Sequence, residues 1–208
     1  MKRLTVNRVM ILYSVTMDSN ISIKEVTDQN WNDMQELFGE KGAYGGCWCT
    51  YFRLKRSEFQ SLPKSGRKEM MSEIISSGKT PGIIAYMEGK PVGWCSVAPR
   101  EEFTLLSTSR IMKPVDSKPV WSIVCFYIDK NFRRKGVMKS LIGGALKYAE
   151  KNHAGIVEAY PIDSGESEYP EPYAYTGLYN AFVDLGFKEV ERRSPKRPIM
   201  RYYLEKTQ

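Results

Sequence analysis

The chain is poor in the residues from which disulfide frameworks and metal sites are built. Its 208 residues include four cysteines and a single histidine. Only Cys47 and Cys49 are close in sequence, and a Cys-x-Cys pair lacks the two-residue gap that is typical of zinc knuckles. We therefore expect no metal site, and we expect reduced thiols in a cytoplasmic protein.

Long apolar runs are missing as well. No stretch is apolar enough to span a membrane, and the amino-terminal segment MKRLTVNRVMILYSV is interrupted by Asn7 and Arg8. No small-residue cleavage site follows it, and the chain shows no internal repeat or low-complexity linker. The sequence predicts no signal peptide and no membrane partner, with one domain over residues 20–208 after an arm, residues 1–19, that need not be ordered.

The charge balance favours an anionic partner. Lysine and arginine number 31 against 24 aspartate and glutamate residues, which gives a net charge of +7. A nucleic acid, a membrane surface or a phosphorylated small molecule would suit this excess. Most cations are scattered and no aromatic-studded RNA-binding signature occurs, so a nucleic-acid-binding module is the weaker interpretation.

Hydrophobic periodicity predicts an α/β fold. Alternating residues at 21–26 indicate a half-buried strand, and the apolar run at 120–128 indicates a strand in the middle of a sheet. A wide apolar stripe over residues 135–151 indicates a helix. The full order is strand, two helices, three strands, helix, strand, helix and two strands, which predicts one domain with a mixed sheet; residues 100–119 form an insertion.

The stretch NFRRKGVMKS, residues 131–140, combines three consecutive cations with a glycine at the point where a helix begins. The first amides of a helix have no partner within it and bind anions, and Gly136 allows an anion to approach them closely. Arg133, Arg134 and Lys135 add charge-assisted contacts, which suits a pyrophosphate. The alternative is a helix start with exposed cations, which oppose the helix dipole.

This stretch is neither GxxxxGK[ST] nor GxGxxG. It resembles the R/Q-x-x-G-x-G/A signature of the GNAT superfamily of acetyl-CoA-dependent N-acyltransferases, matched here by Arg133, Gly136 and the position of Met138. The element order from residue 21 to residue 204 is similar to that fold, and the CWC, EAYP and RPIMR segments look like a sub-group of it. Met138 departs from the signature, which has a small residue at this position. Its side chain narrows the space over the pyrophosphate.

The resemblance implies a central, mixed, mostly antiparallel twisted sheet flanked by helices, with a bulged strand splayed from its neighbour. Pantetheine of acetyl-CoA would lie in the gap, and the amides of the bulged strand would polarise the thioester carbonyl. Residues expected to bind the cofactor are Phe126, Tyr127, Ile128, Arg133, Arg134, Lys135, Gly136, Val137, Met138, Lys139 and Ser140.

Transfer to an amine needs a proton acceptor, and departure of the thiolate is helped by an acid. Glu158, a carboxylate in an otherwise apolar strand, is the first candidate for the base, with Asp129 and Asp163 second; a structural ion pair with an arginine is the equal alternative. The family often places a tyrosine where this chain has Phe182. Tyr179, one helical turn away, is the candidate acid, with Tyr173 and Tyr175 as alternatives.

The acceptor is expected to be the primary amine of a small molecule or peptide, acetylated by direct transfer. Residues expected on the acceptor side of the cleft are Trp48, Cys49, Tyr51, Tyr173 and Tyr175, with Cys47 and Phe52 beside them. The acidic residues Asp163, Glu166, Glu168 and Glu171 suggest a cationic acceptor, unless they form a solvated loop.

Two alternatives stay open from the sequence. An acyl-cysteine intermediate at Cys49 would replace direct transfer. A GNAT-fold regulator that binds acyl-CoA without turnover is the main rival function, and Phe182 in the tyrosine position supports it. A homodimer is a further expectation.

Overall fold

The structure, a computed structural model, describes residues 20–165 and 174–205. The predicted arm, residues 1–19, lies outside the described residues, and so do Glu166, Glu168, Glu171 and Tyr173 of the predicted acidic loop. Among the described residues no helix is long and apolar enough to cross a bilayer.

One mixed sheet organises the described chain. Its strands are β1 (Ile21–Glu25), β2 (Gly82–Met87), β3 (Lys90–Pro99), β4 (Trp121–Ile128), β5 (Ile156–Ala159), β6 (Lys188–Arg192) and β7 (Pro198–Tyr203). Their spatial order is β1-β2-β3-β4-β5-β7-β6, and every neighbouring pair is antiparallel except β4 and β5, which run parallel. The prediction of a single domain with a mostly antiparallel sheet is confirmed.

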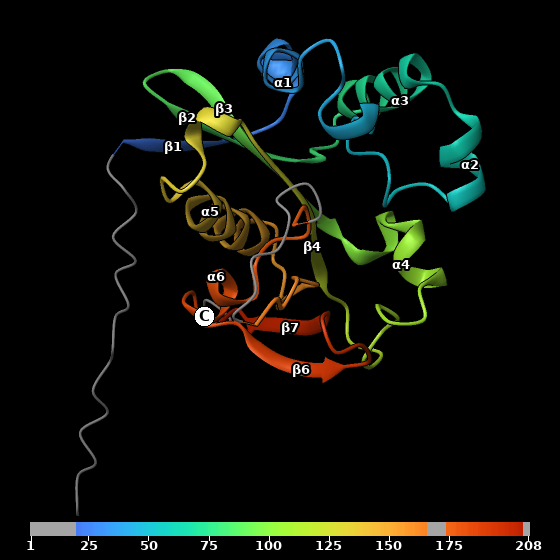
Figure 1. Cartoon of the computed structure of the whole chain (residues 1–208), viewed down its shortest axis with the longest axis vertical. Helices are drawn as coiled ribbons and strands as arrows, with labels where there is room; N and C mark the ends of the chain where they lie inside the picture. The colour runs from blue at the N-terminus through green and yellow to red at the C-terminus, as the bar shows by residue number, and fades with distance from the viewer. Residues whose placement is uncertain (1–19, 166–173, 206–208) are drawn as a thin grey trace, which may run out of the picture.

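Helices cover both faces of this sheet. They are α1 (Trp31–Phe38), α2 (Arg56–Ser61), α3 (Lys64–Ser76), α4 (Thr104–Thr108), α5 (Val137–Lys151) and α6 (Tyr179–Val183). In Figure 1, α1 lies above strands β1 to β3 and α5 lies beneath them. Two details differ from the sequence prediction. Helix α2 was not predicted, and the helix predicted over residues 176–186 is shorter, because Gly177 and Leu178 have non-helical conformations and α6 begins at Tyr179.

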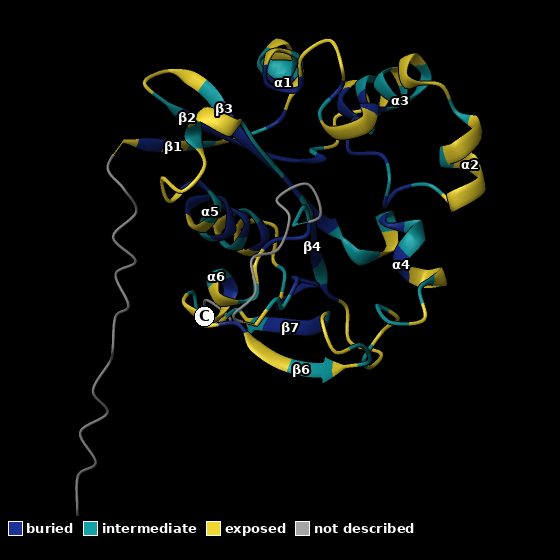
Figure 2. Ribbon diagram, in the orientation of Figure 1, coloured by how far each residue is buried: buried dark blue, intermediate teal, exposed yellow. Residues whose placement is uncertain are grey.

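The buried core explains why α5 begins where it does. Figure 2 shows the inner side of α5 and most of β2, β3 and β4 as buried. The apolar stripe predicted for α5 packs into this core through Val137, Leu141 and Ala145. Gly93 of β3 allows the close approach, since a Cβ atom there would lie 2.7 Å from Cγ1 of Val137. The first turn of α5 is therefore fixed directly against the sheet.

Strand β4 carries the predicted bulge. Cys125 pairs with Ser96 of β3 and Ile123 pairs with Val97, so Val124 is an extra residue in the ladder. On its other side β4 pairs with β5 only over residues 121–123. The two strands are thus splayed past Ile123, as predicted. The backbone groups on this edge of β4 beyond Ile123 are not paired with β5.

Candidate active site

The turn before α5 leaves backbone amides without partners in the helix. Gly136 is the amino-terminal cap of the helix with φ 75°, and Arg134 has φ 61°. The amide of Ser140 is the first to bond within the helix, at 3.1 Å from the carbonyl oxygen of Gly136. The amides of residues 137–139 therefore have no intrahelical acceptor, and they can bind a phosphate group.

The cations of this turn directly precede those amides in sequence and are not buried. Arg133, Arg134 and Lys135 are exposed, and Nε of Arg133 donates to the carbonyl oxygen of Ile128 at 3.2 Å. Lys139 forms an exposed ion pair with Asp184 at 2.7 Å. Met138 is half-buried and packs against the core, so its side chain is only partly available to narrow the space over the amides.

The gap between β4 and β5 holds a backbone donor. The amide of Phe126 donates to the carbonyl oxygen of Tyr175 at 2.6 Å. Ile128 lies two residues further along β4, so its amide faces the same side of the strand. The segment from Ala174 to Leu178 thus follows the free edge of β4, with its far end bridged to Ile162.

A cavity of about 270 Å³ opens beside this edge. It is lined by aromatic rings, small residues and thiols, namely Phe38, Ala43, Tyr44, Gly45, Cys47, Cys49, Tyr51, Phe52, Phe59, Cys125, Phe126, Tyr127 and Tyr175. Of the residues predicted on the acceptor side, Cys49, Tyr51 and Tyr175 line it. The cavity thus joins the CWC segment to β4, two parts of the chain that are far apart in sequence.

Trp48 is placed differently from its prediction. Its ring is buried against Trp31 and Phe38, with ring centroids 5.8 and 5.5 Å apart, and it does not line the cavity. It fills the space between α1 and the sheet, and Lys68 lies over its ring. We therefore regard Trp48 as a support for the cavity wall and not as part of it.

The cavity wall carries thiols and phenols and no charged group among the described residues. Nor does the described chain contain a cluster of three or more histidine, cysteine or acidic residues arranged to hold a metal ion. Burial raises the pKa of Cys47 to about 12. Burial also acts to raise the pKa of Cys49, but hydrogen bonds from Cys125 and Trp94 outweigh it and lower that pKa.

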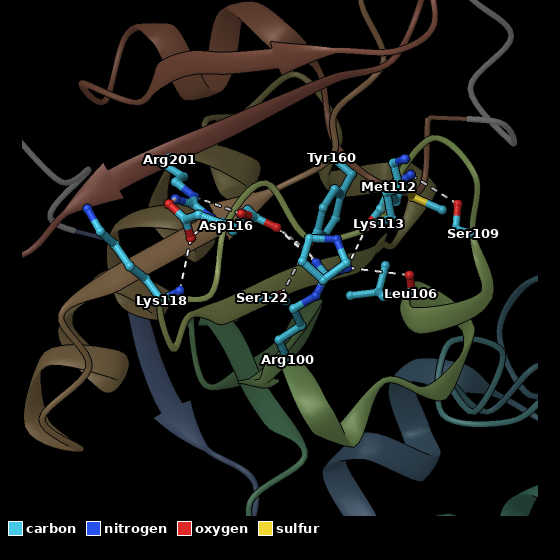
Figure 3. A network of polar contacts seen from close by, with 12 residues as sticks. Arg100, Leu106, Ser109, Met112, Lys113, Asp116, Lys118, Ser122, Tyr160 and Arg201 are labelled. Atoms are coloured by element: carbon cyan, nitrogen blue, oxygen red, sulfur yellow. Dashed lines mark hydrogen bonds and ion pairs between the residues drawn. The ribbon is translucent and has the colours of Figure 1, made fainter.

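Glu158, the first candidate for the base, is buried within a network of polar contacts. Figure 3 shows this network, with its members Arg100, Tyr160 and Arg201 labelled. Its Oε1 atom accepts from Arg100 at 2.8 Å and from the Tyr160 hydroxyl at 2.6 Å, and its Oε2 atom accepts from Arg201 at 2.7 Å. Arg201 also binds Asp116, whose pKa its hydrogen bond lowers to about 2.

This network joins the insertion to the sheet. Arg100 donates to the carbonyl oxygen of Met112 at 2.5 Å, and the Tyr160 hydroxyl lies 3.0 Å from Oγ of Ser122. Both oxygens of Glu158 are occupied by donors, and Glu158 does not line the cavity. The contacts are those of the structural ion pair considered from the sequence, and they leave the role of base without a supporting contact.

Tyr179, Asp129 and Asp163 also lie away from the cavity, whereas Tyr175, an alternative candidate for the acid, lines it. The other alternative, Tyr173, lies outside the described residues. Tyr179 is hydrogen-bonded to Glu189, and burial together with that carboxylate raises its pKa. The guanidinium of Arg192 lies 5.7 Å from the centroid of its ring. Asp163 is paired with the same Arg192 at 2.9 Å. Phe182 is buried against Phe126, with ring centroids 6.1 Å apart.

Several functional positions had no signal in the sequence. Phe38, Phe59 and Cys125 line the cavity, but each comes from a different element, and no motif connects them. The two arginine partners of Glu158 are 58 and 43 residues away along the chain. The RPIMR segment shows that the last strand contains Arg201. The register that places Arg201 opposite Glu158 cannot be read from the sequence.

The fold and this site agree with the family whose sequence model matches the chain. That model is the acetyltransferase (GNAT) family, and it matches residues 48–166, more than half of the chain. The chain therefore belongs to the GNAT family. It is an enzyme of the N-acetyltransferase class, and acetyl-CoA is its co-substrate. No curated protein matches the chain.

Solved structures share the fold at low sequence identity. The aminoglycoside N-acetyltransferase AAC(6')-Iy in complex with CoA is 17% identical, with 93% of this chain and 99% of that chain covered and a TM-score of 0.51. The putative acetyltransferase yncA from Salmonella typhimurium with acetyl-CoA is 11% identical, with 90% and 96% covered and a TM-score of 0.52. An agmatine N-acetyltransferase is 11% identical, with 89% and 100% covered and a TM-score of 0.53.

We predict that Glu158→Ala lowers the free energy of unfolding by about 3–5 kcal/mol, because it leaves two buried guanidinium groups without their carboxylate. Urea unfolding measures this loss. Glu25→Ala is the control, since it removes an exposed ion pair with Lys151 and should cost at most about 1 kcal/mol. Wild-type stability in Glu158→Gln together with abolished acetyl transfer would instead establish the carboxylate as the base.

Proposed function

We propose that this enzyme acetylates the primary amine of a small molecule or peptide that has an apolar body. The observation that carries the proposal is the aromatic cavity beside the free edge of β4, where Phe126 belongs both to the strand and to the cavity wall. A thioester held along β4 would present its carbonyl carbon at this wall. An amine whose apolar part fills the cavity would then lie next to it.

The donor side fits the parts of acetyl-CoA. The unbonded amides of residues 137–139, with Arg134 and Lys135 beside them, suit the pyrophosphate. The gap past Ile123 suits pantetheine, which would replace the carbonyl of Tyr175 as the acceptor for the amide of Phe126. That amide would then polarise the thioester carbonyl during transfer.

The acceptor side favours an apolar substrate over a highly charged one. A cation enters an uncharged aromatic cavity only with loss of its hydration, and the described wall offers no carboxylate in return. Asp163 of the acidic segment is already paired with Arg192. Support for a cationic acceptor therefore depends on Glu166, Glu168 and Glu171, which lie outside the described residues.

Two expectations about the protein in the cell stay predictions. The four cysteines are free thiols, which agrees with the reducing cytoplasm that we expect. A homodimer and the absence of nucleic-acid binding are likewise expectations.

Acetyl-CoA should raise the melting temperature of the protein, whereas ATP and NAD should not. A ligand present at about 100 times its dissociation constant adds about 2.7 kcal/mol of stability, and tenfold weaker binding would leave about half of that. We predict this reduced shift for Lys135→Glu, which reverses a charge beside the helix start. Lys147→Glu changes an exposed lysine elsewhere on α5 and should keep the full shift.

Differential scanning fluorimetry measures these shifts. Equal shifts with all three ligands, or a full shift in Lys135→Glu, would contradict the assignment of the pyrophosphate site. A clear shift without release of free CoA over a wide panel of amines would favour the non-catalytic regulator.

Acceptor choice follows from the cavity. Burying an apolar group the size of a phenylalanine side chain contributes about 1.5–3 kcal/mol, so phenethylamine should exceed methylamine in kcat/KM by roughly tenfold to a hundredfold. Phe59→Ala trims the cavity wall and should reduce this advantage while it changes the rate with methylamine little. A thiol-release assay gives both values. A preference for spermidine or agmatine over phenethylamine would contradict the apolar acceptor.

A further inference from the structure

One aromatic residue of the cavity wall differs from all the others in its surroundings. Tyr44 lines the cavity, yet it is 63% exposed, the highest value among the exposed large hydrophobic residues of the described chain. The role of Tyr44 depends on the proposed function, because it concerns the acceptor that fills this cavity.

Every other aromatic ring of the wall contacts a ring of the protein. Within the wall, ring centroids are 5.5 Å apart for Phe38 and Tyr127, 5.2 Å apart for Tyr51 and Phe59, and 6.3 Å apart for Phe52 and Tyr175. The partner of Phe126 lies outside the wall, since its ring centroid is 6.1 Å from that of Phe182. Distances of this size are typical of aromatic pairs that stabilise one another.

Tyr44 has no such partner among the residues that the structure describes. Its hydroxyl group likewise makes no hydrogen bond with a described residue. A ring that lines a cavity and has no ring partner in the protein can take one from a ligand. Tyr44 is therefore the wall residue that gains most from an acceptor, because its ring has the most surface left to bury.

The backbone holds Tyr44 at the rim of the cavity. Its neighbours Ala43 and Gly45 have φ values of 62° and 66°, so the chain turns sharply on both sides of it. A left-handed residue that is not glycine persists only where the surrounding structure fixes it. Here Nη1 of Arg67 donates to the carbonyl oxygen of Gly46 at 3.2 Å and secures the end of the turn. The exposure of Tyr44 is thus a consequence of how this turn is built.

The size and the chemistry of the cavity limit the acceptor. Its volume of about 270 Å³ lies just below the range of about 300–1,000 Å³ that is usual for ligand pockets, so it suits a small molecule. The described wall offers rings and thiols and no charged group, so a charged part of an acceptor would lose its hydration there without compensation. Aromatic rings attract one another beyond the effect of burial alone, which favours an aromatic acceptor over a saturated one of similar size.

We propose that the acceptor is a small amine that carries an aromatic ring, and that Tyr44 is the residue that selects it. The amine lies toward Phe126, where the thioester carbonyl is expected, and the ring of the acceptor packs against Tyr44 at the rim. Tyr44 binds the acceptor and takes no part in the transfer of the acetyl group.

Two amines of similar size test the preference for a ring. Phenethylamine carries a benzene ring, and cyclohexylethylamine carries its saturated counterpart. The ratio of their kcat/KM values is measured by release of free CoA, for the full-length wild-type protein and for each variant. The two amines differ in basicity, but this difference is the same in every assay and cancels when the ratios of the variants are compared.

Tyr44→Ala should lower this ratio by roughly twofold to tenfold, because only phenethylamine loses a ring contact. Tyr44→Leu keeps an apolar side chain without the ring, and it should lower the ratio in the same way. Tyr44→Phe should keep the ratio. Tyr203→Ala removes an exposed tyrosine of β7 that does not line the cavity, and it should keep the ratio as well.

An unchanged ratio in Tyr44→Ala and Tyr44→Leu would overturn the proposal, and so would a loss in Tyr44→Phe as large as that in Tyr44→Ala. The melting-temperature shift with acetyl-CoA shows that each variant is folded and binds the donor. If the wild-type protein favours phenethylamine over methylamine but the ratio does not respond to Tyr44, only the selection by Tyr44 fails. If phenethylamine has no advantage over methylamine, the proposed apolar acceptor fails first and the aromatic acceptor fails with it.

Discussion

The separation of β4 from β5 is the constraint on which the rest of the site depends. Their parallel pairing ends at Ile123, and the next residue, Val124, is the bulge that changes the register with β3. Beyond it Phe126 directs its amide away from β3, and the strand continues into the turn that starts α5 at Gly136. A fully paired β4 would have no backbone edge to offer a ligand.

An opened sheet loses backbone hydrogen bonds, so other contacts have to hold the neighbouring segments. Glu158 provides them by joining Arg100 at the start of the insertion to Arg201 of β7. The insertion in turn supports the cavity, since the amide of Leu105 donates to the carbonyl oxygen of Phe52 at 3.0 Å. The polar network and the cavity are therefore connected, and the most buried carboxylate supports the site from outside it.

Periodicity in the sequence predicted most of the fold, because strands and long helices bury one face in a regular pattern. The run at 120–128 and the stripe of α5 are clear cases. Helix α2 was missed because its six residues are too few to show a periodic face. The length of α6 was overestimated, since the positive φ of Gly177 and the extended backbone of Leu178 delay its start.

The candidate site was predictable where its parts are continuous in sequence. The turn around Gly136 is one such part, and the CWC segment, whose Cys47 and Cys49 line the cavity, is another. The choice between base and ion pair for Glu158 depended on arginines from distant segments, which no local pattern reveals. The left-handed backbone of Cys49 and the hydrogen bond that its sulfur accepts from Trp94 likewise arise only when the CWC segment packs on the sheet.

The most direct test of the account is a crystal structure of the protein with CoA bound. The account predicts pantetheine between β4 and β5, with the Phe126 amide bonded to the ligand in place of Tyr175 and the pyrophosphate on the amides of residues 137–139. It also predicts that the CoA sulfur reaches the cavity wall beside Phe126. CoA bound elsewhere, or an unchanged bond between Phe126 and Tyr175 in the complex, would contradict it.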